Sequence, residues 1–214
     1  MRIQGILFDM DGTLLDTLTD MQKAVNYVLE AFGYPQRSRE EIRAFVGNGA
    51  ARLIHRALPE GVTPEQEAAV LAAYKRRYQD YSCVETAPYE GIPALLAELE
   101  RRGIRMAVVS NKPDETTRSL AARFFPGLAA QGQRDGIAAK PAPDMVYAAL
   151  EQLGLRPEEA IYVGDSEVDV ETARNAGLRL AAVSWGFRSR EQLQESGAGC
   201  ILARPAELLE LLEN

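Results

Sequence analysis

The sequence predicts an α/β fold in which a doubly wound parallel sheet is interrupted by an all-helical insertion. Three observations support this. An apolar run at residues 6–8 stops at two aspartates one residue apart, which is typical of a buried parallel strand that ends at a site. Roughly seventy residues of helical periodicity then follow without a convincing strand. From Pro88 onward helices and strands alternate, as in a sheet with right-handed crossovers.

Composition limits the function classes. The 214 residues are enough for a core domain with a small insertion, and 46% hydrophobic with 26% charged residues is ordinary for a globular protein. A net charge of −7 argues against a nucleic-acid partner. No apolar run is long enough to cross a bilayer. Cys83 and Cys200 form no C-x-x-C pair and no signal peptide is evident, so we expect a cytoplasmic protein without a membrane partner. The oligomeric state is not specified.

The insertion is expected to contain four helices. The first has an apolar face of Val25, Val28, Leu29 and Phe32, and it ends before Gly33. A capping box of Ser38 and Glu41 opens the second, which stops at residue 47. The third covers residues 52–58. The fourth begins with Thr63, Pro64 and Gln66 and runs toward residue 81. These helices predict a cap domain at 17–86 and a core at 1–16 and 87–214.

The remainder of the chain is expected to complete the sheet. Strands are predicted at 106–109, 161–163, 180–183 and 201–202, and helices at 93–102, 114–124, 143–153, 168–176, near 191 and from 205. Residues 126–139 are rich in glycine and weakly patterned, with at most one short strand.

Polar residues follow three of these strands at the point where each ends. They are Asp9, Ser110 and Asp165. Because the carboxyl ends of parallel strands lie at one edge of a sheet, these side chains should converge on a site. A phosphoryl group needs a nucleophile, a cation and hydrogen-bond donors, and this edge has candidates for each.

Four short motifs resemble those of the haloacid dehalogenase superfamily in its phosphatase form, and they occur in the family's order along essentially the whole chain. They are Asp9-x-Asp11-Gly12-Thr13-Leu14, Val108-Val109-Ser110-Asn111, Lys140-Pro141-Ala142-Pro143-Asp144 and Gly164-Asp165-Ser166-x-x-Asp169. The resemblance implies a Rossmann-like core with a helical cap, and a small phosphorylated metabolite as partner.

The resemblance also implies a role for each motif residue. Asp9 would be the nucleophile that forms an aspartyl-phosphate, and Asp11 would act first as acid and then as base. Lys140 would offset the negative charge. Ser110, Asn111 and Gly12 would bind the phosphoryl group. Mg²⁺ would be held by Asp9, Asp165 and the backbone carbonyl of Asp11. Asp169 and Ser166 would orient these groups without contacting the metal themselves.

Further stretches are similar to the phosphoglycolate phosphatase branch, which implies 2-phosphoglycolate as substrate. They are Val46-Gly-Asn-Gly49 with Arg56-Ala-Leu58, Pro88-Tyr-Glu-Gly91, and Ser184-Trp-Gly-Phe-Arg-Ser-Arg190. The cap would be a mobile lid in which Asn48 and Arg52 meet the substrate. Asp11 disfavours a dehalogenase. A pyrophosphatase, a sugar-phosphate phosphatase or mutase, and a non-catalytic regulatory module remain alternatives.

Simpler structural explanations exist for the same residues. Asp9 and Asp11 could belong to a hairpin turn, Ser110 or Asp165 could cap the helix that follows it while Asp169 faces solvent, and Lys140 could be a surface charge. A serine hydrolase or histidine-based phosphatase is disfavoured, since there is no G-x-S-x-G and His55 is the only histidine.

Overall fold

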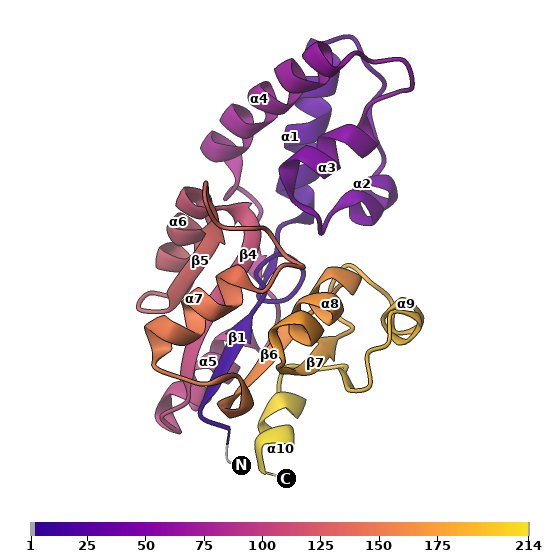
Figure 1. Cartoon of the computed structure of the whole chain (residues 1–214). Helices are drawn as coiled ribbons and strands as arrows, with labels where there is room; N and C mark the ends of the chain where they lie inside the picture. Colours follow the sequence, from indigo (N-terminus) through magenta and orange to yellow (C-terminus); the bar gives the residue numbers. More distant parts are fainter. Residues whose placement is uncertain (1–2, 214) are drawn as a thin grey trace. The chain divides into compact units, whose positions relative to one another are not determined.

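The computed structural model describes residues 3–213. It divides the chain into two compact units, which we call the sheet unit (residues up to Leu15 together with those from Pro88) and the helical unit (Asp16–Ala87). Figure 1 shows the elements of both units along the chain. Among the described residues, no helix combines the length and the apolar character needed to cross a membrane.

The sheet unit is built on six parallel strands in the order β5-β4-β1-β6-β7-β8. Their bounds are β1 Gly5–Phe8, β4 Arg105–Pro113, β5 Ala129–Gln133, β6 Ala160–Gly164, β7 Arg179–Val183 and β8 Ile201–Leu202. β1 lies in the middle, with Phe8 opposite Val108 on one side and Val163 on the other. Order and direction confirm the predicted doubly wound α/β fold.

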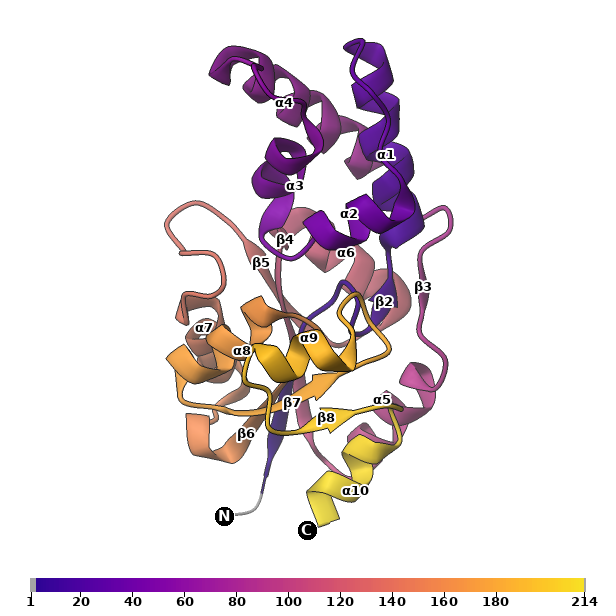
Figure 2. The same cartoon turned by 90° about the vertical axis from the view of Figure 1, so that its right-hand side faces the viewer.

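Helices cover both faces of this sheet. They are α5 Ile92–Arg101, α6 Asp114–Phe124, α7 Asp144–Leu153, α8 Glu167–Ala176, α9 Arg190–Glu195 and α10 Glu207–Glu213, with a 3-10 turn, η1, at Pro157–Glu159. Right-handed crossovers place α7 and α8 on the face opposite α5 and α6, as Figure 2 shows. Under α7 and α8, Leu7, Val109 and Tyr162 pack with Met145 and Ala173 in one buried cluster. This packing fixes the strand ends at which the candidate site is formed.

The helical unit contains α1 Leu18–Ala31, α2 Arg39–Phe45, α3 Gly49–Ala57 and α4 Pro64–Tyr81. The capping boxes of Ser38 with Glu41 and of Thr63 with Gln66 are both formed, as predicted. Two details of the prediction were wrong. α3 begins at Gly49, three residues early. Phe32 caps α1 and is 41% exposed, because the helix ends before Phe32 can join its buried face.

The side chain of Asp20 holds the end of the helical unit to its beginning. This buried carboxylate accepts hydrogen bonds from the backbone N–H groups of Val84, Glu85 and Thr86 and from the Thr86 hydroxyl, at 2.8–3.1 Å. The chain passes between the two units through β2 (Leu15–Asp16) and β3 (Ala87–Pro88), which pair with each other. The sequence did not predict this ribbon.

The second strand of the sheet differs from its prediction. β4 continues past Val109 through Lys112 to Pro113, with an irregular register against β5 between Val109 and Pro113. Pro113, rather than Ser110, is the N-cap of α6. The proposal that Ser110 caps this helix is therefore wrong, because the chain stays extended for three residues beyond Ser110. The weakly patterned segment 126–139 contains β5.

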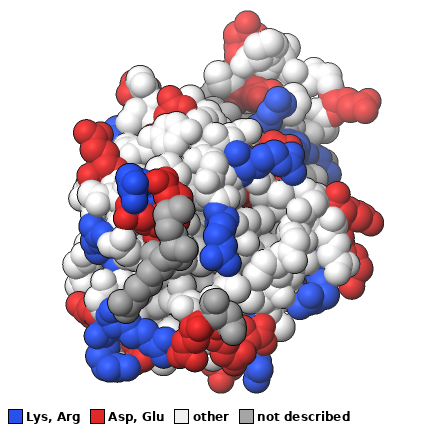
Figure 3. Space-filling model, turned by 60° about the horizontal axis from the view of Figure 1, so that its bottom comes forward, with Lys and Arg blue, Asp and Glu red and all other residues white. Residues whose placement is uncertain are grey.

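The surface of the sheet unit shows no large field of one sign on the side that carries the chain termini. Figure 3 shows acidic and basic side chains intermingled there.

Candidate active site

The end of β1 carries two aspartates in different environments. Asp9 follows the last β1 residue, and its backbone N–H donates to the carbonyl of Val163 on β6 at 2.8 Å. Gly12 then turns the chain at φ +83°, and a Cβ at this position would overlap the carboxylate of Asp165. Only glycine therefore fits at position 12. The hairpin alternative is wrong, because β1 pairs with β4 and β6 and not with a strand that follows the turn.

Lys140 is at the centre of the buried polar network. Its ammonium lies 2.9 Å from Asp9 Oδ1, from Asp169 Oδ1 and from the Tyr162 hydroxyl. The Lys140 side chain is only 2% exposed, so it is not a surface charge. The Lys140–Pro141 peptide bond is cis. One ammonium thus links Asp9 to two groups from β6 and α8.

Asn111 fixes the backbone of that lysine. Its side-chain amide donates to the Lys140 carbonyl at 3.0 Å and accepts from the Lys140 N–H at 2.7 Å. These two bonds join the end of β4 to the segment before α7. Ser110, which is 1% exposed, accepts from the Lys112 N–H at 3.2 Å. Both predicted phosphate-binding residues of β4 therefore lie at the carboxylate cluster.

Asp165 and Asp169 follow β6 and have distinct surroundings. Asp169 accepts from Lys140 and Tyr162 on one oxygen, and on the other from the N–H groups of Asp165 and Ser166 and from the Ser166 hydroxyl at 2.6 Å. Asp165 accepts on Oδ2 from the Phe187 N–H at 2.6 Å. The alternative in which Asp165 caps α8 while Asp169 faces solvent is wrong, since Ser166 is the N-cap and Asp169 is fully buried.

Burial changes the proton affinity of these groups. Burial raises the pKa of Asp9 to about 7, and the positive charge of Lys140 only partly opposes this effect. Burial also raises the pKa of Asp165 well above its usual value, with Asp169 and Asp9 adding to the effect. For Lys140, burial alone would lower the pKa, but Asp169 and Asp9 raise it well above its usual value. Lys140 is therefore cationic, and the cluster favours an additional positive charge.

The carboxylates fit a hard divalent cation. One oxygen from each of Asp9, Asp165 and Asp169 lies within 4.8 Å of the others. Of these, Asp169 accepts five hydrogen bonds on its two oxygens. Asp165, by contrast, accepts one short bond, from the Phe187 N–H, and a long one of 3.4 Å from the Thr13 hydroxyl. Asp9 and Asp165 are therefore the better candidates for direct ligands, with Asp169 orienting them. Their all-oxygen chemistry and raised pKa values are what a Mg²⁺ site would show before the cation binds.

The predicted site residues fall into two groups. Those of the sheet unit come together at the ends of β1, β4 and β6: Asp9, Asp11, Gly12, Ser110, Asn111, Lys140, Asp165, Ser166 and Asp169. Asn48 and Arg52 belong to the helical unit, at the start of α3. There Asn48 Oδ1 accepts from Arg56 at 3.0 Å, which holds the turn between α2 and α3. His55 pairs with Glu67 on α4, away from this turn.

Sequence reasoning missed three contributors. Tyr162 was predicted only as a strand residue, Phe187 bonds Asp165 through its backbone N–H, and Lys112 follows directly after the second motif. Lys112 is buried, and its ammonium lies 3.2 Å from Asp11 Oδ2. The position of Lys112 just after Ser110 and Asn111 was the one available signal, because it continues the strand toward the site.

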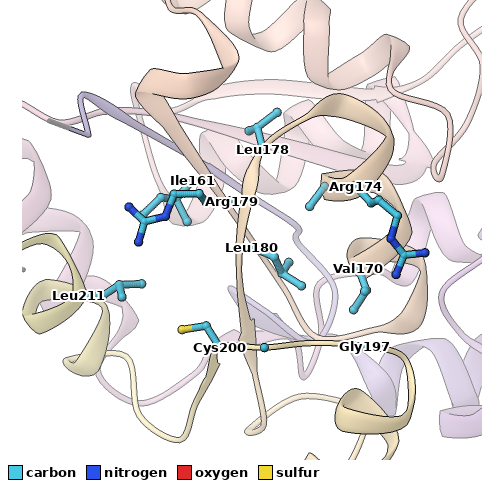
Figure 4. Close-up of a pocket in the computed structure, with 11 residues that line it drawn as sticks. Ile161, Val170, Arg174, Leu178, Arg179, Leu180, Gly197, Cys200 and Leu211 are labelled. Atoms are coloured by element: carbon cyan, nitrogen blue, oxygen red, sulfur yellow. The ribbon is translucent and has the colours of Figure 1, made fainter. Parts of the chain in front are cut away.

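A separate hollow in the sheet unit has no part in this cluster. About 380 Å³ in volume, it is lined by Ile161, Leu180, Arg174, Arg179 and Leu211 among others. Figure 4 shows Arg174 and Arg179 pointing away from Leu180 on opposite sides. Ile161 and Arg179 lie near the starts of β6 and β7, which is the opposite end of the strands from Asp165.

Comparisons with known proteins agree on the family to which this chain belongs. The family model described as haloacid dehalogenase-like hydrolase matches residues 6–183. The N-acetylmuramic acid 6-phosphate phosphatase of Pseudomonas aeruginosa is 32% identical, covering 100% of this chain and 96% of that protein. The phosphoglycolate phosphatase of Aquifex aeolicus is also 32% identical, with 98% and 96% covered. Among solved structures, this chain resembles a protein of Lactobacillus delbrueckii that is described as a putative phosphoglycolate phosphatase. The two superpose with a TM-score of 0.94 at 36% identity, over 99% of both chains.

Proposed function

Because the chain belongs to the haloacid dehalogenase-like hydrolases and is a phosphatase of that family, we propose that it hydrolyses a small phosphate monoester with Mg²⁺ through an aspartyl-phosphate. The observation that carries this proposal is the buried pairing of Asp9 with Lys140 beside Asp165, with a second carboxylate, Asp11, two residues after Asp9. A site of this kind combines a nucleophile, fixed positive charge and an acid or base.

Asp9 is the proposed nucleophile. An oxygen of its carboxylate attacks phosphorus in line with the leaving oxygen, so that a carboxylate–phosphorus bond forms as the ester bond breaks. Lys140 and the donors of Ser110 and the local backbone would stabilise the charge on the phosphoryl oxygens. Bound Mg²⁺, held by Asp9, the Asp11 backbone carbonyl and Asp165, would supply further charge neutralisation there.

Asp11 is the proposed acid and base. Its carboxyl gives a proton to the leaving oxygen in the first step, and its carboxylate takes a proton from the attacking water in the second. The water attacks phosphorus, the bond to Asp9 breaks, and inorganic phosphate leaves. Asp11 is close to Asp9 in the chain but has its own lysine partner, Lys112, so the two carboxylates can take different roles.

For the substrate we propose 2-phosphoglycolate. Support comes from relatives of that name. A second candidate is N-acetylmuramic acid 6-phosphate. The relative named for that activity is 32% identical to this chain, the same identity as the phosphoglycolate phosphatase of Aquifex aeolicus. Both molecules carry a carboxylate besides the phosphate. Asn48 and Arg52 of the helical unit are proposed to bind that part of the substrate, with the unit acting as a lid.

The test is phosphate release by the purified protein from a panel of these two substrates, pyrophosphate and sugar phosphates. We expect release that requires Mg²⁺ and is greatest for 2-phosphoglycolate. Activity on the panel that persists in chelator would contradict the metal requirement. A preference for N-acetylmuramic acid 6-phosphate would select the second candidate. Isomerised sugar phosphate with little net release would indicate a mutase.

A further inference from the structure

Lysine is rare in this chain, and two of its four lysines lie at the candidate site. Of the 24 basic residues, only Lys23, Lys75, Lys112 and Lys140 are lysines. Lys112 and Lys140 are both buried, at 6% and 5% exposure. They have different carboxylate partners: Lys140 pairs with Asp9 at 2.9 Å and Lys112 with Asp11 at 3.2 Å. Each of the two aspartates after β1 therefore has a buried lysine of its own.

The chain holds Lys112 in place from both sides of its peptide. Its N–H donates to Ser110 Oγ at 3.2 Å, and its carbonyl accepts from Thr117 Oγ1 at 3.2 Å. The first bond ties Lys112 to Ser110, two residues earlier on β4, and the second ties it to α6. The Lys112 side chain is only 4% exposed and that of Asp11 is 13% exposed. The ion pair therefore has a defined geometry in a place that water scarcely reaches.

Such a pair is a poor way to stabilise a fold. Removing an ammonium from water carries a desolvation cost that its partner charge does little more than offset, and an apolar side chain of similar size at such a position is often as stabilising. The fold therefore gives no clear reason for a charge at position 112. The candidate site does give one, because the partner is the proposed acid and base.

We propose that Lys112 is a positioning residue that orients the Asp11 carboxyl toward the leaving oxygen of the substrate. This inference rests on the proposed function. With Oδ2 held by Lys112, the other oxygen of Asp11 carries the proton that passes to the leaving oxygen as the phosphorus–oxygen ester bond breaks. The same oxygen takes the proton back from water when the aspartyl-phosphate is hydrolysed. Lys112 gains and loses no proton in either step.

The test compares Lys112→Met and Lys112→Gln on two kinds of substrate, the best alkyl phosphate of the panel and p-nitrophenyl phosphate. The aryl leaving group departs without a proton. If Lys112 acts through Asp11, kcat for the alkyl phosphate should fall about 100-fold, with little change in KM. The first-turnover burst of p-nitrophenol should keep its wild-type rate within a few-fold. Lys140→Met is the matched control and should impair both substrates, because both require Asp9.

A double-mutant cycle separates positioning from direct contact. In an Asp11→Asn background, Lys112→Met should cause no further loss on the alkyl phosphate, because its effect passes through Asp11. A full further loss, or an equal loss of burst rate and alkyl turnover, would overturn the inference and assign Lys112 to the phosphoryl group. Thermal unfolding of each variant identifies losses due to misfolding, and the two substitutions at 112 guard against failure of one. A wild-type protein inactive on every substrate would instead defeat the proposed function, and this inference with it.

Discussion

Asp9 and Asp11 differ sharply in their surroundings although only Met10 separates them. Asp9 contacts Lys140 and lies with Asp165 and Asp169, whereas Asp11 contacts Lys112. Equal chemistry at the two positions is therefore not expected. Asp9→Asn should abolish turnover with the fold intact, since an amide of the same shape is a poor nucleophile. Far-ultraviolet circular dichroism checks the fold and phosphate release checks the activity.

Asp11→Asn should keep the nucleophile and lose the proton transfers. We expect alkyl phosphate hydrolysis to fall about 10²–10⁴-fold. With an aryl phosphate, a phosphorylated enzyme should accumulate, because the second step lacks its base. Mass spectrometry of the acid-quenched protein measures this, as an added phosphoryl group on the peptide containing Asp9. Mild and equal losses in the two variants would mean that the roles are misassigned.

The raised pKa of Asp9 links metal binding to pH. In the metal-free protein, a pKa of about 7 means that folded Asp9 holds its proton well above the pH at which the unfolded chain releases it. Stability without metal should therefore fall as pH rises from about 4 to about 7. Mg²⁺ must displace that proton, so its affinity should be about tenfold weaker at pH 6 than at pH 8.

Thermal shift titrations with Mg²⁺ at the two pH values test this. The concentration that gives half of the full rise in Tm should be higher at pH 6. Asp9→Asn removes the titrating proton, so whatever Mg²⁺ binding it retains should vary less with pH. Equal midpoints at the two pH values in the wild-type protein would show that Asp9 is already ionised at pH 6.

At the scale of the elements, Asp20 is the strongest candidate for a single residue that holds the helical unit together. Replacing it with alanine would leave the N–H groups of Val84, Glu85 and Thr86 without this acceptor. Thr86 is buried, whereas Val84 and Glu85 are exposed and their N–H groups can bond water instead. An unsatisfied buried group costs about 1–3 kcal/mol, so we expect a loss of about that size. Hydrogen exchange at 84–86 should rise in step with this loss.

Glu85→Ala is the control for that substitution. Glu85 lies in the same segment but forms an exposed ion pair with Lys23. Exposed pairs contribute between zero and about 1 kcal/mol. Denaturation curves for the two variants should therefore differ clearly. A similar small change in both would show that backbone donors at 84–86 find water or other acceptors once Asp20 is gone.

The elements that sequence predicted well are those encoded locally. Ser38 with Glu41 and Thr63 with Gln66 mark their helices within four residues. β5, by contrast, reads Ala-Ala-Gln-Gly-Gln and has no apolar alternation, so only its pairing with β4 makes it a strand. The two-residue strands β2 and β3 are too short to show any period. Asp20 looked like an ordinary acid in the first turn of α1, because its partners are distant in sequence.

At the candidate site, too, the sequence predicted only what short local motifs encode. The motifs singled out Asp9, Asp11, Lys140, Asp165 and Asp169 as candidates. The strand ends predicted that Asp9, Ser110 and Asp165 would converge. Tyr162 and Lys112 could not be assigned in this way. One has the sequence signature of a core residue and the other that of a surface charge, and only the three-dimensional contacts with Lys140 and Asp11 place them at the site.

At the scale of the molecule, the two units divide the proposed work. If chemistry belongs to the sheet unit and selection to the helical unit, Asn48→Ala and Arg52→Ala should change substrate preference and not chemistry. We expect kcat/KM for the best carboxylate-bearing substrate to fall roughly tenfold or more, the usual effect of losing one charged hydrogen bond. Hydrolysis of p-nitrophenyl phosphate, which has no carboxylate, should stay within a few-fold of wild type.

Arg76→Ala is the matched control for those variants, since Arg76 is an exposed arginine of α4 in the same unit. It should leave every substrate unchanged. If Arg52→Ala instead lowered kcat/KM for all substrates by the same factor, the turn before α3 would not select substrates. The specificity role of the helical unit would then be dropped.

The central position of β1 has a consequence for how the chain acquires its structure during synthesis. Gly5 pairs with Arg105 on one side and Ala160 on the other, so β1 leaves the ribosome well before either of its partner strands has been made. The helices of the insertion have only local and nearby contacts to form, and they can fold while β1 is still unpaired. Long-range strand pairing is slow, and unpaired apolar strands are prone to aggregate. The nascent chain therefore exposes Ile6, Leu7 and Phe8 until β4 and β6 have both been translated.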